Sequence, residues 1–139
     1  MTTIATDREL PSPSITPENA AFFEASARGV LLLKFCDACG RHHYYPRALC
    51  PHCFSERTRW VEASGRGRIY TYSVLRLGTP TPFALAYVQL EEGPRMMTNI
   101  VDCDLDALAI DMPVRLVCKP SKDGTMIPMF TPAAAGAAQ

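Results

Sequence analysis

The apolar positions of the chain predict one short helix, followed by a series of strands. Alanine and phenylalanine recur at spacings of 3 and 4 residues between positions 20 and 27, which is the period of one helix face. Thr16 and Pro17 are typical of a helix start, and Gly29 is typical of the position just after a helix end. The predicted helix therefore runs from residue 17 to residue 28.

Phe22 and Phe23 lie side by side in this predicted helix. Two adjacent phenylalanines are more apolar surface than a solvent-exposed helix usually carries. They either pack on the protein's own core or form an interface with a partner subunit. The sequence leaves both alternatives open.

From Trp60 onward the pattern changes to runs that are rich in β-branched and aromatic residues, separated by turn residues. The predicted strands cover residues 68–77, 83–90, 95–101, 114–118 and 126–130, with a short helical connection at 102–109. Gly65 and Gly67 precede the first strand and allow the bulge or sharp bend that a barrel corner needs. Five short strands with a helix between the third and fourth predict a small barrel of the OB type.

Two Cys-x-x-Cys pairs carry the strongest chemical signal. The metal ligands that we predict are Cys36, Cys39, Cys50 and Cys53. Two such pairs separated by 10 residues are typical of a zinc ribbon, in which four thiolates surround one Zn²⁺. Because four cysteines fill the tetrahedral positions, we expect a structural rather than a catalytic zinc. The nearby His42, His43 and His52 are expected to be loop residues.

The fold class that we predict is mostly β, with an N-terminal helix, a zinc ribbon and a five-stranded OB-fold barrel. The expected divisions are a flexible N-terminal arm at 1–16, the helix and ribbon at 17–59, the OB-fold at 60–132 and a flexible tail at 133–139. The arm contains prolines and serines without periodicity, and the tail is made mostly of small residues.

Composition and charge exclude only a few classes of function. Hydrophobic residues make up 47% of the chain and the formal net charge is zero. Residues 28–76 hold 9 basic and 3 acidic residues, so this segment is positively charged and the remainder is negatively charged. The positively charged segment could bind a phosphorylated ligand or an acidic partner, or it could be a solvated surface. No apolar run approaches the length of a membrane span, and no signal peptide is recognisable. We therefore expect no membrane association, a cytoplasmic location and reduced cysteines.

The remaining polar residues do not form a complete catalytic arrangement in the sequence. Cys103 and Cys118 lack a nearby histidine and are expected to be inert small hydrophobic residues. The aspartates between positions 102 and 111 do not fit a calcium loop and are expected to serve turns and helix caps. Nucleotide-binding and hydrolase motifs are not recognisable. An accessory or binding role is favoured, and whether the protein is an enzyme stays open.

The order of these motifs resembles the acyl-CoA-associated family of small proteins with a rubredoxin-like zinc ribbon and an OB-fold. The similarity covers about residues 17–132. The motifs that carry it are Cys-x-x-Cys-Gly at 36–40, Pro-Arg-x-x-Cys-Pro-x-Cys at 46–53, Trp-Val-Glu-Ala-Ser-Gly-Arg-Gly at 60–67, Ala-Tyr-Val-Gln-Leu-Glu-Glu-Gly at 86–93 and Thr-Asn-Ile-Val at 98–101.

The resemblance implies a non-catalytic accessory or scaffold subunit of a thiolase-superfamily enzyme, in which the larger partner carries the catalytic residues. It also implies acyl-CoA as the ligand of the assembly, shared with the partner. Arg47, Arg66 and Arg68 are the candidates for contact with the phosphates of CoA. The family pattern does not identify the acyl group.

Two other functions remain as alternatives. The first is a free-standing acyl-CoA binder. The second is a nucleic-acid-binding module, because ribbons and OB-folds both serve that role. Zero net charge disfavours the second, and we expect the barrel aromatics Tyr70, Tyr72, Phe83 and Tyr87 to pack in the core. No nucleic-acid partner is therefore expected.

Overall fold

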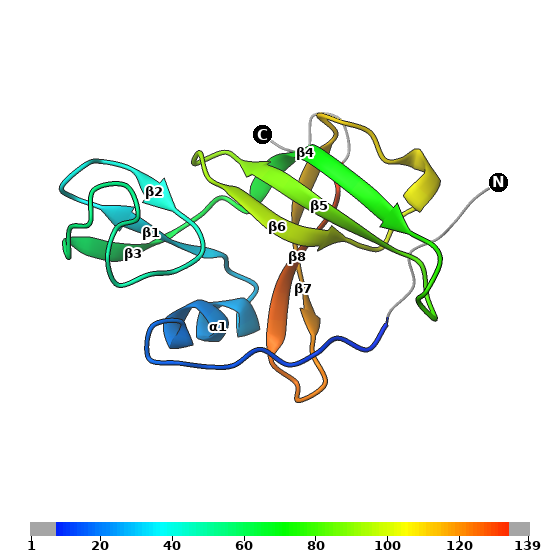
Figure 1. Ribbon diagram of the computed structural model, residues 1–139, viewed down its shortest axis with the longest axis horizontal. Helices are drawn as coiled ribbons and strands as arrows, with labels where there is room; N and C mark the ends of the chain where they lie inside the picture. The colour runs from blue at the N-terminus through cyan, green and yellow to red at the C-terminus, as the bar shows by residue number, and fades with distance from the viewer. Residues whose placement is uncertain (1–7, 134–139) are drawn as a thin grey trace.

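The computed structural model describes residues 8–133, so residues 1–7 of the expected flexible arm and residues 134–139 of the expected tail lie outside the described residues. Figure 1 shows a small three-stranded sheet beside a larger β-barrel, with one helix below the space between them. The elements are α1 (Ala20–Ala27), β1 (Leu32–Cys36), β2 (His42–His43), β3 (Thr58–Glu62), β4 (Arg66–Leu75), β5 (Phe83–Leu90), β6 (Arg95–Ile100), η1 (Leu105–Ala107), β7 (Pro113–Pro120) and β8 (Met126–Pro132).

Helix α1 is shorter than the sequence predicts. It begins at Ala20, because the residues before it form a turn in which the side chain of Asn19 accepts a hydrogen bond from the backbone N–H of Thr16 at 2.8 Å. Its end agrees with the prediction. Gly29 adopts a left-handed φ of 76°, and the N–H of Val30 returns to the carbonyl of Ala25 at 3.0 Å. This is the usual way in which a glycine closes a helix.

The ribbon part is a three-stranded sheet in the order β2-β1-β3. β1 pairs antiparallel with both neighbours, and Lys34 lies opposite Trp60 on β3. β3 therefore crosses the domain division that we expected between residues 59 and 60. Its full length pairs with β1, so by strand pairing the ribbon extends to Glu62.

The barrel is closed, with the strand order β4-β5-β6-β8-β7, which confirms the five-stranded OB-type prediction. The predicted short helical connection is the single turn η1 between β6 and β7. A bulge between Ile69 and Thr71 shifts the register of β4 against β5. β6 and β8 meet at only one pair, Ile100 with Phe130, so the barrel closes loosely along this seam.

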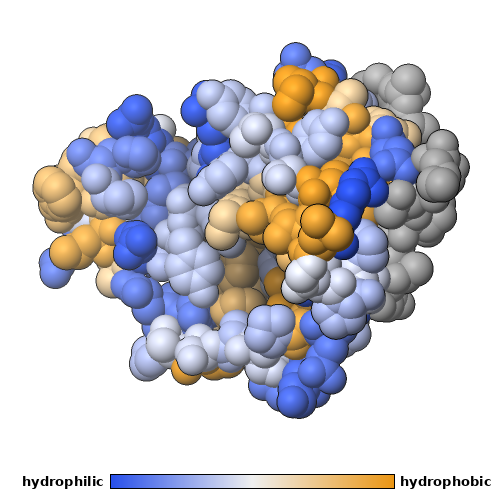
Figure 2. Space-filling view, turned by 45° about the vertical axis from the view of Figure 1, so that its right-hand side comes forward, coloured by the Kyte–Doolittle hydropathy of each residue, from blue (hydrophilic) through white to orange (hydrophobic). Residues whose placement is uncertain are grey.

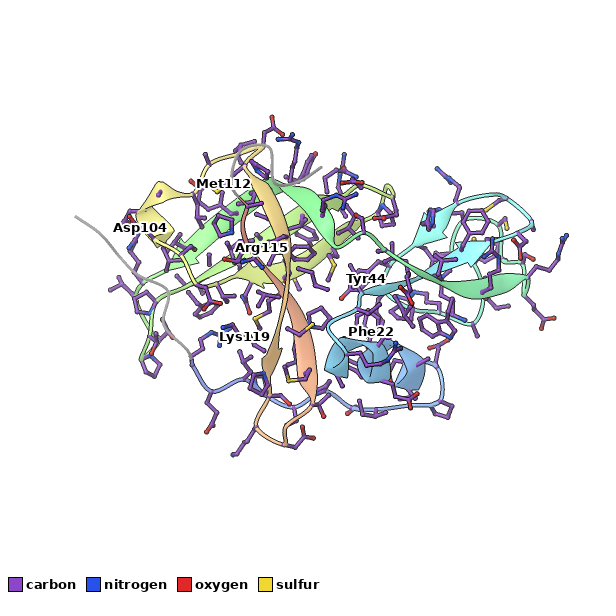
Figure 3. All side chains as sticks on the ribbon, turned by 180° about the vertical axis from the view of Figure 1, so that it is seen from behind. Phe22, Tyr44, Asp104, Met112, Arg115 and Lys119 are labelled. Carbon is purple, nitrogen blue, oxygen red and sulfur yellow. The ribbon has the colours of Figure 1, made fainter. Side chains whose placement is uncertain are left out.

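One hydrophobic core joins the two parts. Leu31 and Leu33 from the ribbon side belong to the same buried cluster as Ile69 and Phe130 of the barrel. Phe22 of α1 is 1% exposed and also belongs to this cluster. Figure 3 shows it beside Tyr44, where α1 faces the ribbon. Because helix, ribbon and barrel share these side chains, their mutual orientation is fixed by packing.

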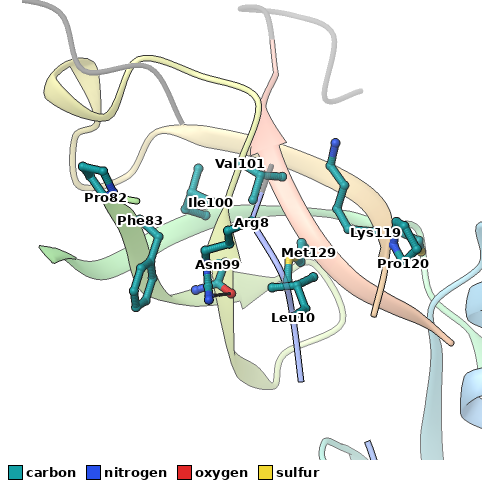
Figure 4. A pocket seen from close by; sticks show the side chains of 11 residues that line it. Arg8, Leu10, Pro82, Phe83, Asn99, Ile100, Val101, Lys119, Pro120 and Met129 are labelled. Carbon is teal, nitrogen blue, oxygen red and sulfur yellow. Dashed lines mark hydrogen bonds between the residues drawn. The ribbon is translucent and has the colours of Figure 1, made fainter. Parts of the chain in front are cut away.

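The described part of the N-terminal arm has no helix or strand, but it is bound to the barrel. Leu10 is 7% exposed, and its carbonyl accepts a hydrogen bond from the N–H of Lys122 at 2.9 Å. Arg8 donates to the Oδ1 of Asn99 at 3.1 Å and stacks on the ring of Phe83 at 3.9 Å (Figure 4). Arg8 and Leu10 are therefore in contact with the barrel, and flexibility of the arm as a whole stays a prediction. These two residues line a cavity of about 320 Å³ beside the seam between β6 and β8.

Candidate metal centre and its surroundings

The four predicted ligands meet in one place. The Sγ atoms of Cys36, Cys39, Cys50 and Cys53 all lie within 4.8 Å of one another. Cys36 and Cys53 are separated by 3.6 Å between sulfurs, and Cys39 and Cys50 by 3.7 Å. Four sulfurs at about 2.3 Å from a tetrahedral Zn²⁺ stand about 3.8 Å apart. The cysteines therefore fit one zinc ion, and two of them are buried while two are exposed.

The same turn is built twice around this centre. The N–H of Gly40 donates to the carbonyl of Cys36 at 2.8 Å, and the N–H of Phe54 donates to the carbonyl of Cys50 at 2.7 Å. Both donors have a left-handed φ, of 73° for Gly40 and 64° for Phe54. In the first turn glycine meets this requirement without strain. In the second a phenylalanine that is 76% exposed occupies the same conformation.

The electrostatics of the cluster favour a cation. Burial acts to raise the pKa of the Cys36 thiol, but hydrogen bonds from the backbone N–H groups of Cys39 and Ala38 and from neighbouring thiols outweigh it and lower the pKa to about 7. Desolvation by the surrounding atoms is the main cause that raises the pKa of Cys39 to about 12. Its contacts with the other three thiols raise it further, because crowded thiols cannot all ionise together. A divalent metal removes this conflict, since coordinated thiols are deprotonated.

The other cysteines and the histidines stay outside the centre. Burial is the main cause that raises the pKa values of the Cys103 and Cys118 thiols, as expected for inert residues. None of the three histidines belongs to the metal-binding group among the described residues. His43 is 3% exposed on β2, and its burial lowers its pKa, so its ring is neutral at pH 7.

The aspartates behave as predicted from their spacing. Asp104 accepts a hydrogen bond from the N–H of Asp106 at 3.0 Å and so caps η1. Asp102 and Asp111 have left-handed φ values of 56° and 68°, as residues in tight turns do. Asp102 also pairs with Lys119 at 2.8 Å. These contacts confirm a structural role in turns and caps.

The three candidate arginines are not gathered by any one of the described cavities. Arg66 makes two hydrogen bonds to the carboxylate of Glu91, at 2.6 and 3.1 Å. Arg68 donates to the backbone carbonyl of Asp111 at 2.9 Å. Arg47 is exposed in the connection between β2 and β3. Arg66 and Arg68 are therefore partly engaged within the protein, and contact of any of them with CoA stays a prediction.

The two candidate interface residues lie in different surroundings. Phe22 is buried in the protein's own core, so it is not available to a partner, and the prediction is wrong for this residue. Phe23 is half-buried, with its ring edge-on to Phe22 at 5.0 Å between centroids. It lines a groove of about 220 Å³ between α1, the ribbon and the barrel. Phe23 alone remains a candidate.

A surface that our reading of the sequence missed lies on the outer side of the barrel. Tyr70 and Tyr87 are 48% and 46% exposed, although we expected both to pack in the core. Strict alternation along β5, where Ala86 and Val88 are buried, would have placed Tyr87 outside. Tyr70 is the residue of β4 that the bulge leaves without a partner on β5, and no sequence pattern locates this bulge.

The fold and the cysteine cluster together define a class of protein: a rubredoxin-like zinc ribbon joined to an OB-fold barrel. Family models agree with this assignment. Residues 23–59 match the "ChsH2, rubredoxin-like zinc ribbon domain", and residues 60–119 match the "ChsH2, C-terminal OB-fold domain". The solved structure of the "Ltp2-ChsH2(DUF35) aldolase" aligns with a TM-score of 0.76 and 35% sequence identity. The alignment covers 88% of this chain and 100% of that one.

Curated relatives extend the comparison. A "DUF35 domain-containing scaffold protein" of Methanothermobacter thermautotrophicus is 37% identical over 66% of this chain and 76% of its own length. The "Benzoylsuccinyl-CoA thiolase subunit BbsA" of Geobacter metallireducens is 31% identical over 61% of this chain and 59% of its own length. A "Probable enoyl-CoA hydratase alpha subunit" of Thermomonospora curvata is 36% identical over 88% of this chain, which spans only 40% of that protein.

The chain belongs to the DUF35 family of proteins with a ChsH2-type zinc ribbon and OB-fold. In residues 8–133, no helix has the length and apolar character to cross a membrane.

Proposed function

We propose that this protein is a non-catalytic accessory subunit of a thiolase-type acyl-CoA enzyme, whose larger partner subunit carries out the chemistry. The observation that carries the proposal is the match to the DUF35 chain of the Ltp2-ChsH2 aldolase, which extends over the whole of that chain. The scaffold protein of Methanothermobacter thermautotrophicus and the thiolase subunit BbsA support the same role from the sequence side.

The physical properties of the chain suit a scaffold. Helix, ribbon and barrel share one core, so surfaces far apart in the sequence keep a fixed orientation. A rigid subunit loses little conformational entropy when it binds, and this favours assembly. Side chains that could take part in a reaction have structural roles in this chain. The four ribbon cysteines suit a structural zinc, and the hydroxyl of Tyr72 donates to the carbonyl of Leu108 at 2.9 Å.

We infer further that the assembly handles an acyl-CoA and that Arg47 contacts a phosphate of the CoA moiety. Arg47 is exposed and makes no ion pair with the described residues, whereas Arg66 is held by Glu91. The test measures CoA affinity of the purified assembly by calorimetry. Arg47→Ala should weaken it at least fivefold, and Arg28→Ala, an exposed arginine after α1, should not. Equal affinities in both variants would remove Arg47 from the site.

Four cysteines that bind a metal must stay reduced, so they suit a reducing compartment, and this supports the cytoplasm as the location.

The experiment that tests the main proposal is recovery of the tagged chain from its source organism, with the bound proteins identified by mass spectrometry. A thiolase-superfamily protein should be recovered in a fixed ratio to the tagged chain. That protein is then assayed for carbon–carbon bond cleavage or formation with and without this chain. A chain that is recovered without any thiolase-superfamily protein, or whose addition leaves the activity of the partner unchanged, would overturn the proposal.

A further inference from the structure

The outer face of β4, β5 and β6 has an unusual composition for a solvent-exposed surface. Its outward positions are 68, 70, 71, 73 and 75 on β4, 83, 85, 87 and 89 on β5, and 95, 97 and 99 on β6. They hold apolar, aromatic and neutral polar side chains with two arginines, and no Lys, Asp or Glu. Solvated strands usually carry such charges, so this face differs from an ordinary solvated sheet.

Strand register brings the large side chains of this face together. Tyr87 lies opposite Met97 on β6 and opposite Thr71 on β4. Leu85 occupies the next outward position of β5. The exposed fractions are 46% for Tyr87, 52% for Met97 and 39% for Leu85, and those of Tyr70 and Leu75 on β4 are 48% and 37%. Figure 2 shows hydrophobic residues gathered over the middle of the molecule, beside a hollow.

One of the two arginines of this face, Arg95, is held in place by side chains of the same face, whereas Arg68 donates to the backbone carbonyl of Asp111. The guanidinium of Arg95 stacks on the ring of Tyr70 at 3.9 Å and donates to the Oε1 of Gln89 at 2.9 Å. An arginine and a tyrosine fixed in this way lose little side-chain entropy when a partner covers them. Aromatic residues, Met and Arg are enriched in protein–protein interfaces, whereas Lys, Glu, Asp, Ser and Ala are depleted. The face carries most of this signature.

The face continues into the groove that Phe23 lines. Leu85 and Met97 form part of both, and Tyr45 of the ribbon stands on the far side of the groove. Three strands about 4.8 Å apart and about 26 Å long present roughly 370 Å². A stable interface buries about 800 Å² on each partner. The face alone is therefore about half of an interface, and the groove with the adjoining surface of α1 supplies a further part.

We propose that the outer face of β4–β6 and the adjoining groove are the surface on which the thiolase-type subunit binds. This inference rests on the proposed function and adds the place of contact. The partner's matching surface is apolar and carries carboxylates, because the face offers two arginines and no acid. The competing occupant is single-stranded nucleic acid, since OB-folds bind it with exposed aromatics and cations. The absence of lysine from the face and the zero net charge favour the protein.

The test uses the thiolase-superfamily protein that is recovered with the wild-type chain, purified and titrated against variants of the full-length chain. Tyr87→Glu and Met97→Glu each place a carboxylate on the face without touching the core. Each should weaken binding at least tenfold, as interface residues at the centre of a contact do. Phe54→Glu is the matched control, because Phe54 is 76% exposed in the second cysteine turn of the ribbon. It should stay within twofold of wild type. All variants should keep one zinc per chain and the thermal midpoint of the wild type.

Each other result has a definite meaning. If the wild type recovers no thiolase-superfamily protein, the proposed function fails and this inference fails with it. If the wild type binds the partner and both face variants bind equally well, the proposed function stands and this surface is wrong. If oligodeoxythymidine binds the wild type more tightly than the protein partner does, and Tyr87→Glu abolishes that binding, the face is a nucleic-acid surface and the inference is overturned.

Discussion

Gly67 on β4 is the residue at which the structure permits the sharpest stability prediction. It is buried and pairs with Leu90 on one side and Val114 on the other. A Cβ added at this position would lie 2.6 Å from the backbone oxygen of Gln89 and 2.7 Å from the Cγ1 of Val88. Ordinary contacts begin at 3.4 Å, so the neighbouring strand must retreat by about 0.8 Å. Because the obstacle is backbone, a rotamer change cannot relieve it.

The magnitude of Gly67→Ala follows from two opposing terms. Overpacking in a well-ordered core costs about 1–3 kcal/mol. Alanine lowers the conformational entropy of the unfolded chain, which stabilises the folded state by about 0.4–1 kcal/mol. This gain applies here because the φ of Gly67 lies outside the left-handed region, so alanine can adopt it. We expect a net loss of about 1–2 kcal/mol in the free energy of unfolding, and a thermal midpoint lower by about 3–8 °C.

The assay is thermal and urea unfolding of the zinc-loaded protein, followed by circular dichroism. Ser73→Thr is the matched control, because it adds a methyl group to the outward face of the same strand. Its midpoint should change by less than about 2 °C, which corresponds to the ±0.5 kcal/mol of ordinary surface changes. A Gly67→Ala midpoint equal to or above that of wild type would refute the close-approach argument.

Three further predictions concern the ribbon and the turn between β7 and β8. Zinc removal by chelator at pH 7, or Cys39→Ser, should unfold the ribbon and change the fluorescence of Trp60, the single tryptophan. The control Cys118→Ser should retain one zinc per chain by metal analysis. Unchanged fluorescence in metal-free protein would contradict this prediction. Phe54→Gly should raise the free energy of unfolding by up to about 1 kcal/mol in urea titrations, because glycine adopts the left-handed φ of 64° without strain and little burial is lost. A fall in the free energy of unfolding by more than about 1 kcal/mol would show that the Phe54 side chain makes stabilising contacts. Hydrogen bonds from Thr125 and Ser121 lower the pKa of Asp123 from 3.8 to about 2. Its contribution to stability is therefore present above pH 3.8 and lost as the pH falls towards 2, so Asp123→Asn should flatten stability against pH across that window. A wild-type profile that is already flat there would rule out this role.

The parts that sequence could predict are those in which the signal is local. Each Cys-x-x-Cys turn closes within five residues, so spacing was enough to identify the metal centre. Gly29 ends α1 through contacts within its own turn. The barrel strands followed from runs of β-branched and aromatic residues between turn residues. These features depend on neighbours in the chain, which any reader of the sequence can see.

The parts that sequence could not predict depend on contacts between distant residues. The arm is bound because Leu10 meets Lys122, which lies more than a hundred residues further along the chain. Phe22 rather than Phe23 enters the core, because the direction of α1 is set by the ribbon and barrel against which it packs. The pairing of Arg66 with Glu91 likewise arises only when β4 and β5 are aligned. Such outcomes need the tertiary structure.

The architecture links the metal centre to partner binding, although no cysteine lies on the proposed docking face. One side of the groove is formed by Phe23 and the ribbon residue Tyr45, and the other by Met97 of the barrel. If zinc is lost, the ribbon side loses its fixed position, and a partner that spans the groove must order it again on binding. We therefore expect metal-free protein to bind the thiolase-type subunit at least tenfold more weakly, while the circular dichroism of the barrel strands persists. Zinc-loaded Cys118→Ser is the control, and it should bind as the wild type does. Equal affinity of metal-free and zinc-loaded protein would show that the barrel face binds the partner without the groove.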